Sequence, residues 1–121
     1  MRVPILLAIF VLATCVACAP TPPLVGQRSI DDSGIAYVAD LWVAGMATTC
    51  RRIDAASYRE WIGTISTAPA YANLSATQRS ALNESASALL ERSGMNHCAR
   101  VSVLYADMRS RYSAAGIIVP G

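Results

Sequence analysis

The apolar N-terminal segment most strongly limits how much of this chain can fold as a domain. Its first 19 residues carry one charge, Arg2, and form an otherwise almost wholly apolar run that ends at a proline cluster, Pro20–Pro23. A basic residue followed by a short apolar run is the pattern of a secretory signal peptide. A membrane-spanning helix usually needs about 20 apolar residues with anchoring residues at both ends, so a retained anchor is the weaker alternative. We therefore predict that residues 1–17 are removed, which leaves about 100 residues for one small domain.

Two cysteines, Cys15 and Cys18, close this segment. A cysteine directly after a small residue and an apolar run resembles the lipobox of bacterial lipoproteins, in which that cysteine becomes the first mature residue and carries acyl chains. Cys18 follows Ala17, which suits the cleavage position, and it precedes a proline-rich stretch. Cys15 has the better residue three positions earlier, Leu12, and is the alternative. Ordinary cleavage near Ala17 or Ala19 would instead release a soluble periplasmic protein.

The lipoprotein resemblance also implies a location. In that family, a residue other than Asp after the acylated cysteine usually directs the protein to the outer membrane, and here that residue is Ala19. Several acyl chains anchor a protein stably where a single chain does not. We therefore expect a protein anchored in the outer membrane through its lipid and facing the periplasm.

The charges exclude two further classes of protein. Ten arginines, no lysine and eight acidic residues give a net charge of +2, which is too small for a protein that binds nucleic acid through a basic face. Hydrophobic residues make up 54% of the chain, so it is not a disordered acidic or basic tail.

Helix signals predict an all-α fold, with a proline-rich extended tether over 18–28 and four helices within 29–113. The first helix is expected to begin at Ser29, which has capping-box spacing to Asp32, and the second to follow Asp54 as its N-cap and end at Ser66. The periodicity places the following residues on the buried face of the first helix: Ile35, Val38, Ala39, Trp42, Met46 and Ile53. Gly45 in this helix is expected to allow a neighbour to pack closely.

The second half of the domain has equally specific signals. Ser75 and Gln78 form a capping box for a third helix that ends near Arg92, and Gly94 occupies the position of a left-handed C-terminal residue. Asn96 is expected to cap the fourth helix. The expected apolar positions of these two helices are Leu82, Ala86, Leu89 and Leu90, followed by Cys98, Val101, Leu104, Tyr105, Met108 and Tyr112. Residues 114–121 are predicted to form a loose tail, in which residues 117–119 are the ones able to dock on the bundle.

Cys50 and Cys98 are the two cysteines of the predicted domain, and an exported protein meets an oxidising compartment. Cys50 lies near the end of the first helix and Cys98 near the start of the fourth, so antiparallel packing of these helices would bring them together. We therefore predict a disulfide. A reactive thiol, or a metal site that uses the adjacent His97, is the alternative, although a metal site normally needs three or four closely spaced ligands. We expect no bound metal and no cofactor.

Catalytic signals are weak. His97 is the only histidine, and no serine lies in a nucleophile-elbow motif. The chain has no glycine-rich phosphate loop either. We predict a protein that is not an enzyme and has no small-molecule substrate.

Three aromatic residues, Trp42, Tyr58 and Trp61, recur at helical spacing. Such residues are usually part of a core. If they were exposed between helices, they would form an aromatic groove for a partner helix.

The order of these features resembles the pilotins of type II secretion, which are small outer-membrane lipoproteins that escort secretin subunits. Pilotins have a lipobox cysteine, a polar tether, a four-helix domain and a disulfide from the end of the first helix to the start of the last. Here Cys18 is followed by VADLWVAGMATTC, which ends at Cys50, and by GMNHCAR, which contains Cys98. Only the cysteines can be matched residue by residue.

This resemblance implies a lipid-anchored module that binds a protein partner in the cell envelope, namely the tail helix of a secretin subunit in a hydrophobic groove. Two other functions remain open. One is a periplasmic inhibitor or immunity protein that makes contact through the loop 67–74. The other is a small disulfide-bonded helical chaperone, which should be soluble and not acylated.

Overall fold

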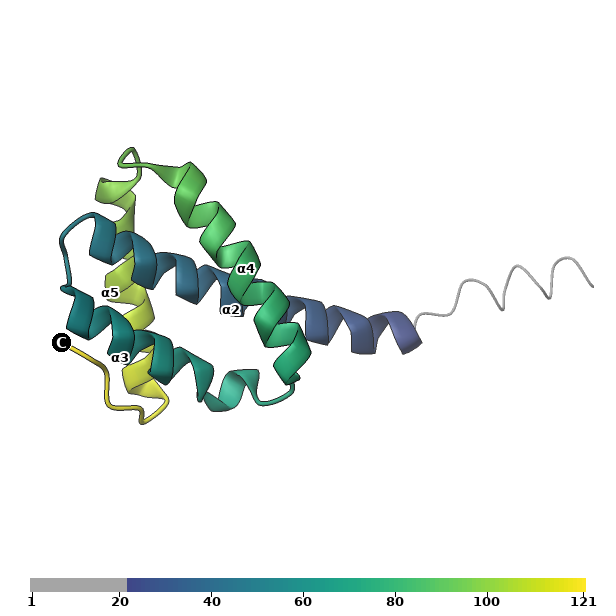
Figure 1. The fold of residues 1–121 in the computed structure, drawn as a ribbon. Helices are drawn as coiled ribbons and strands as arrows, with labels where there is room; N and C mark the ends of the chain where they lie inside the picture. The colour runs from purple at the N-terminus through teal and green to yellow at the C-terminus, as the bar shows by residue number, and fades with distance from the viewer. Residues whose placement is uncertain (1–21) are drawn as a thin grey trace, which may run out of the picture.

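The computed structural model describes residues 22–121, with side chains described from residue 32 onward. Its elements are α2 (Pro22–Thr49), α3 (Ala55–Ser66), the short 3-10 helix η1 (Pro69–Tyr71), α4 (Ala76–Ser93) and α5 (Cys98–Ala114). The described part contains four α-helices and no strand, so the all-α prediction is confirmed (Figure 1). The predicted signal peptide, with Cys15 and Cys18, lies outside the described residues.

Helix α2 is the centre of the fold. It packs against α3, α4, α5 and η1, which surround its C-terminal half (Figure 1). The stretch from Val43 to Ala47 is buried on every side. A helix that is apolar all round is typical of a fully enclosed position.

The single buried face predicted for this helix is therefore wrong in part. Met46 is buried, whereas Ile35 is 69% exposed and Ala39 is also exposed. Tyr37 and Leu41, which lie outside the predicted face, are buried. One apolar stripe is expected for a helix at the edge of a core, but a helix with neighbours on three sides buries residues around its whole circumference.

The start of α2 also differs from the prediction. The helix begins at Pro22, so residues 22–28 of the predicted tether form its first turns, and Ser29 lies inside the helix rather than at its cap. Proline is tolerated in the first turn of a helix because the N–H groups there have no partner within the helix.

The caps of α3 and α4 are as predicted. The Asp54 carboxylate accepts a hydrogen bond from the Ser57 N–H at 2.8 Å. In α4 the Gln78 N–H donates to Ser75 Oγ at 3.1 Å, and the Ser75 N–H donates to Gln78 Oε1 at 2.8 Å. These local hydrogen bonds depend on spacing alone, which is why sequence identifies them.

The connection from α4 to α5 departs from the prediction. Gly94 has the expected positive φ of 59°, but its ψ of −157° places it in an extended conformation open mainly to glycine rather than in the left-handed helical region. Helix α5 begins at Cys98, with His97 at the N-cap position and no side-chain cap, so Asn96 does not cap it. Leu89, predicted to point inward, is 38% exposed.

The C-terminal segment 114–121 is packed against the bundle in part, although Ile118 is 93% exposed. Pro120 is buried, and Ile117 and Val119 pack against the core. The Arg109 guanidinium donates to the Pro120 carbonyl oxygen at 2.6 Å. Gly116, with φ of 80°, turns the chain back after α5.

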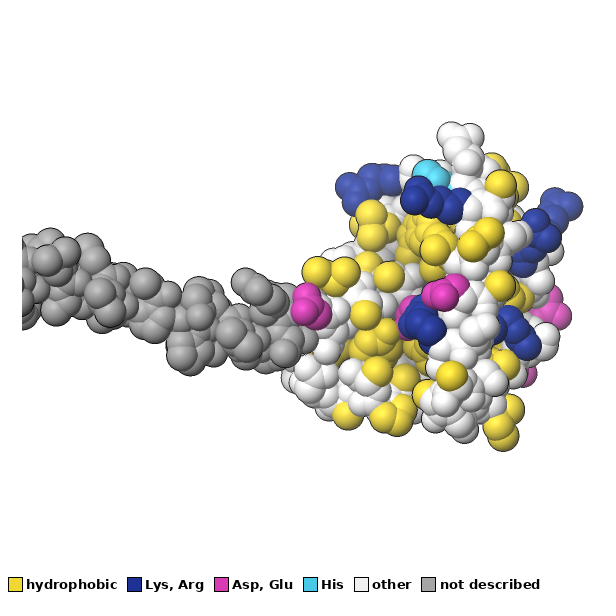
Figure 2. Space-filling model, turned by 180° about the vertical axis from the view of Figure 1, so that it is seen from behind, with side chains coloured by type: hydrophobic (Ala, Val, Ile, Leu, Met, Phe, Trp, Pro, Cys, Tyr) yellow, Lys and Arg dark blue, Asp and Glu magenta, His cyan; other side chains and the backbone are white. Residues whose placement is uncertain are grey.

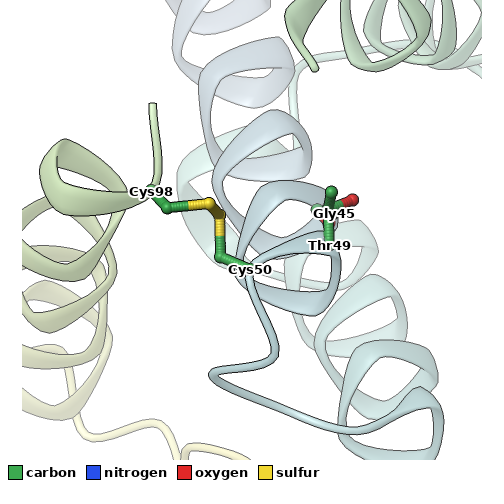
Figure 3. Close-up of a disulfide and its surroundings, with 4 residues drawn as sticks. All are labelled: Gly45, Thr49, Cys50 and Cys98. Atoms are coloured by element: carbon green, nitrogen blue, oxygen red, sulfur yellow. Dashed lines mark hydrogen bonds between the residues drawn. A yellow bond between two sulfur atoms is a disulfide. The ribbon is translucent and has the colours of Figure 1, made fainter. Parts of the chain in front are cut away.

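Cys50 and Cys98 form the predicted disulfide, with a Cα–Cα distance of 5.5 Å (Figure 3). The bond joins the residue after α2 to the first residue of α5. Close by on α2, a Cβ atom added to Gly45 would lie 2.6 Å from the methyl carbons of Leu90. This glycine therefore lets α4 approach α2 closely, as the sequence predicts.

We expect the disulfide to contribute about 4 kcal/mol to the free energy of unfolding, because it closes a long loop in the unfolded chain. The two cysteines are 48 residues apart. Denaturant unfolding with and without reductant measures the effect. The double variant Cys50→Ser with Cys98→Ser should match the reduced protein and be insensitive to reductant; equal stability of the oxidised and reduced proteins would contradict the expectation.

Candidate functional site

The three aromatic residues do not form the predicted groove. Trp61 is fully buried, and its Nε1 donates to the Tyr105 hydroxyl at 3.0 Å. Trp42 is half-buried and its Nε1 donates to Ser93 Oγ at 2.8 Å. Tyr58 is half-buried at a separate cavity of about 190 Å³ between α3 and α4. Trp61 is thus a core residue, and the three side chains share no surface.

A different groove lies between α2 and the first half of α4. It has a volume of about 630 Å³, and its lining residues are Gly34, Ile35, Val38, Leu74, Gln78, Ala81, Leu82 and Ser85. No titratable side chain lines it, so its chemistry suits an apolar surface rather than a catalysed reaction. The periodicity of the sequence assigned Ile35 and Val38 to the core, and only the placement of α4 shows that they line a groove.

The residues that line this groove differ in size and exposure. Gly34 has no side chain, and a Cβ at this position would lie 3.6 Å from Leu82. Leu74 is buried and Leu82 is half-buried, whereas Ile35 at the rim is 69% exposed. An exposed isoleucine next to an apolar depression is the kind of surface that marks a binding site.

The Arg79 guanidinium holds the segment at one end of the groove. It donates to the carbonyl oxygens of Leu74 at 3.1 Å, Tyr71 at 2.5 Å, and Ser66. It also lies over the ring of Tyr37, 5.7 Å from the centroid. These bonds satisfy carbonyl groups at the C-terminal end of α3 and around η1, and they order the segment 67–74 against α2.

A buried acidic side chain forms the main polar cluster. Asp40 of α2 is 2% exposed, and its Oδ2 accepts hydrogen bonds from the hydroxyls of Tyr71 at 2.5 Å and Tyr112 at 2.8 Å. Its Oδ1 accepts from Arg111 Nη2 at 3.0 Å, and Arg111 also pairs with Asp107 at 3.1 Å. The buried face predicted from periodicity does not include Asp40. The sequence signal that could have indicated its burial is a single acidic residue within an apolar stretch.

This cluster connects α2, η1 and α5. Burial, together with the hydrogen bond to the negatively charged Asp40, raises the pKa of both Tyr71 and Tyr112 well above the ordinary value for tyrosine. A cavity of about 290 Å³ adjoins the cluster. Because both carboxylate oxygens are already hydrogen-bonded within the protein, we assign the cluster a structural role.

The structure also places His97 and Cys98, which the alternative metal site would have used. His97 packs edge-on against Trp42, with ring centroids 6.0 Å apart, and the neighbouring Cys98 is bonded to Cys50. Over the described range, no three His, Cys, Asp or Glu side chains gather as metal ligands would. Within this same range, no helix combines the length and hydropathy needed to cross a bilayer.

Comparison with known proteins finds no matching family model, no similar curated protein and no similar solved structure.

We expect Tyr112→Phe to lower the free energy of unfolding by about 1.5–3 kcal/mol at neutral pH, because it removes a hydrogen bond to a buried carboxylate. The raised pKa adds a pH dependence. Since the unfolded state loses the tyrosine protons first, native stability should fall above about pH 10, by up to about 1.4 kcal/mol per pH unit for each protected tyrosine.

The variant should therefore lose stability less steeply with pH than the native protein. Denaturant unfolding at pH 7 and at pH 10–11 measures both effects. Tyr58→Phe is the matched control, because the Tyr58 hydroxyl makes no hydrogen bond within the described residues. Equal losses in the two variants would contradict the role assigned to Tyr112.

Proposed function

We propose that this protein is a non-enzymatic, lipid-anchored module of the bacterial cell envelope that binds a protein partner. The observation that carries the proposal is the apolar groove between α2 and α4. Its occupant would be an amphipathic helix of the partner, with apolar residues at positions i, i+3, i+4 and i+7.

The shape of the groove supports a helical occupant. Two helices form its walls: Ile35 and Val38 are one turn apart on α2, and Gln78, Ala81 and Ser85 follow one another along α4. A groove between the ridges of two helices matches the side-chain ridges of a third. The lining offers few hydrogen-bonding side chains, so shape and apolar contact would provide most of the affinity.

The position of the groove supports a partner in the envelope. Gly34 lies 12 residues into α2, which corresponds to about 18 Å along the helix axis. A lipid on Cys18, four residues before Pro22, would therefore hold the groove close to the membrane surface. Within this proposal, the pilotin resemblance specifies the partner as the tail helix of a secretin subunit and the location as the outer membrane.

The inhibitor alternative relies on the segment 67–74. Ala68, Tyr71 and Leu74 of this segment are buried, and Arg79 holds its backbone. The groove, by contrast, offers an unfilled apolar surface, so we base the proposal on the groove. The lipid anchor distinguishes the proposed function from the chaperone alternative, because a soluble chaperone would lack it.

We expect the mature protein to carry acyl chains on Cys18. Intact-mass analysis of protein from membrane fractions tests this. Cys18→Ala should abolish acylation and release the protein into the soluble periplasmic fraction, whereas Cys15→Ala should change neither. The reverse pattern would move the anchor to Cys15, and an unacylated native N-terminus beyond Cys18 would remove the anchor from the proposal.

For the groove, we expect Ile35→Glu to weaken binding of a secretin tail peptide by at least about tenfold, since a charge would have to be buried against apolar groups. Ile35 is largely exposed in the free protein, so its replacement should leave the fold intact. Peptide titration followed by fluorescence anisotropy measures the change.

Val103→Glu is the matched control, because Val103 on α5 is also 69% exposed but lies outside the groove. A photo-reactive residue at position 35, but not at position 103, should crosslink to the secretin tail in envelopes. If both positions crosslink to the secretin equally, or neither does, the groove is not its binding site.

A further inference from the structure

The end of the bundle that carries the disulfide also gathers four arginines. Arg51 and Arg52 directly follow Cys50, Arg92 lies in the last turn of α4, and Arg100 lies in the first turn of α5. All four are exposed. Figure 2 shows arginine side chains around a histidine at one end of the domain.

These arginines have no acidic partner within the described residues. The ion pairs formed there join Arg111 to Asp40 and to Asp107. Two acidic residues, Asp54 and Glu91, lie close in sequence to the four arginines, and Asp54 already accepts a hydrogen bond from the Ser57 N–H. This end of the domain therefore has an excess of positive charge that the fold does not use for ion pairs.

Favourable interaction with the helix dipoles does not explain all of these arginines. A positive residue in the first turn of a helix opposes the helix dipole, and Arg100 has that position in α5. Arg51 adopts a left-handed conformation with φ of 59°, at a helix C-terminus where glycine is favoured. The Arg51 N–H donates to Thr48 O and the Arg52 N–H to Ala47 O, so this conformation is part of the end of α2.

The backbone segments that carry these arginines are held together by a disulfide and a hydrogen bond. The disulfide holds the two chain segments with Cα atoms 5.5 Å apart, and Trp42 donates to Ser93 Oγ at the end of α4. None of the described cavities is lined by any of the four arginines. Met95, between Arg92 and Arg100, is 60% exposed and adds an apolar contact. A preorganised surface of arginine and methionine suits a macromolecule better than a small anion.

We propose that this arginine end, formed by Arg51, Arg52, Arg92 and Arg100 with Met95, binds an acidic segment of a protein partner. A protein is favoured over the anchoring membrane by distance, an argument that relies on the anchor of the proposed function. Helix α2 has 28 residues and is about 42 Å long, with the anchor at its opposite end. Electrostatic attraction is screened over about 8 Å at physiological salt, so the headgroups around the anchor lie out of range when the helix stands away from the membrane.

The test uses the full-length protein in detergent and a fluorescent peptide of ten glutamates with an apolar residue at its centre. Arg52→Ala with Arg100→Ala should weaken binding by about tenfold, because two exposed charge contacts are lost. Arg59→Ala, an exposed arginine on α3 outside the arginine end, should change binding less than about twofold. Ile35→Glu should also have no effect, so failure of the groove and failure of the arginine end are distinguishable. Equal losses in the double variant and in Arg59→Ala would overturn the proposal.

A second measurement identifies the natural occupant. A photo-reactive residue at position 95 should crosslink, in native envelopes, to an acidic segment of a protein, and the crosslink should disappear in the Arg52→Ala and Arg100→Ala background. Crosslinks to lipid would overturn the proposal, as would tight binding of the Cys18→Ala protein to vesicles containing phosphatidylglycerol without binding to the acidic peptide.

Discussion

The Asp40 carboxylate is the constraint around which the rest of the domain is arranged. It lies inside an apolar core, where an unpaired charge would strongly oppose folding. Three donors from two other parts of the chain, Tyr71, Tyr112 and Arg111, must therefore reach it together. Apolar contacts alone would allow helices to slide or rotate against one another, whereas this carboxylate accepts its partners in a single arrangement. The cluster thereby sets how η1 and α5 lie on α2.

Around this cluster, α2 acts as a central rod with different constraints at its two ends. At its C-terminal end the disulfide and Gly45 hold α5 and α4 close (Figure 3). Toward its N-terminal end no disulfide is present in the described residues, and the apolar groove lies between α2 and the first half of α4. The domain is therefore covalently cross-linked and closely packed at one end of α2, and it has an unfilled apolar surface nearer the other end.

This asymmetry gives the two proposed surfaces distinct physical properties. The groove is apolar and close to the point where the tether would leave α2, so contact there would depend little on salt. The arginine end is charged and distant from that point, so contact there would weaken as salt increases. A single partner with an apolar helix and an acidic segment would bind both surfaces. Binding at one surface would then raise the effective concentration of the partner's other segment at the second surface.

The sequence by itself determined the features that depend on local spacing or on chain chemistry. Four helices, the caps at Asp54 and Ser75 and the pairing of Cys50 with Cys98 follow from residues near in sequence or from a small set of cysteines. The absence of a side chain at Gly45 indicated that a neighbour could pack closely there, although not which one. Tertiary structure alone decided which helix is enclosed. It therefore also decided that Asp40 is buried and Ile35 is exposed. It also brought Ile35 of α2 and Leu82 of α4 to one groove. The physical reason is that periodicity reports how apolar residues are spaced around one helix, whereas burial depends on how many neighbours surround that helix, which is set by contacts between distant parts of the chain.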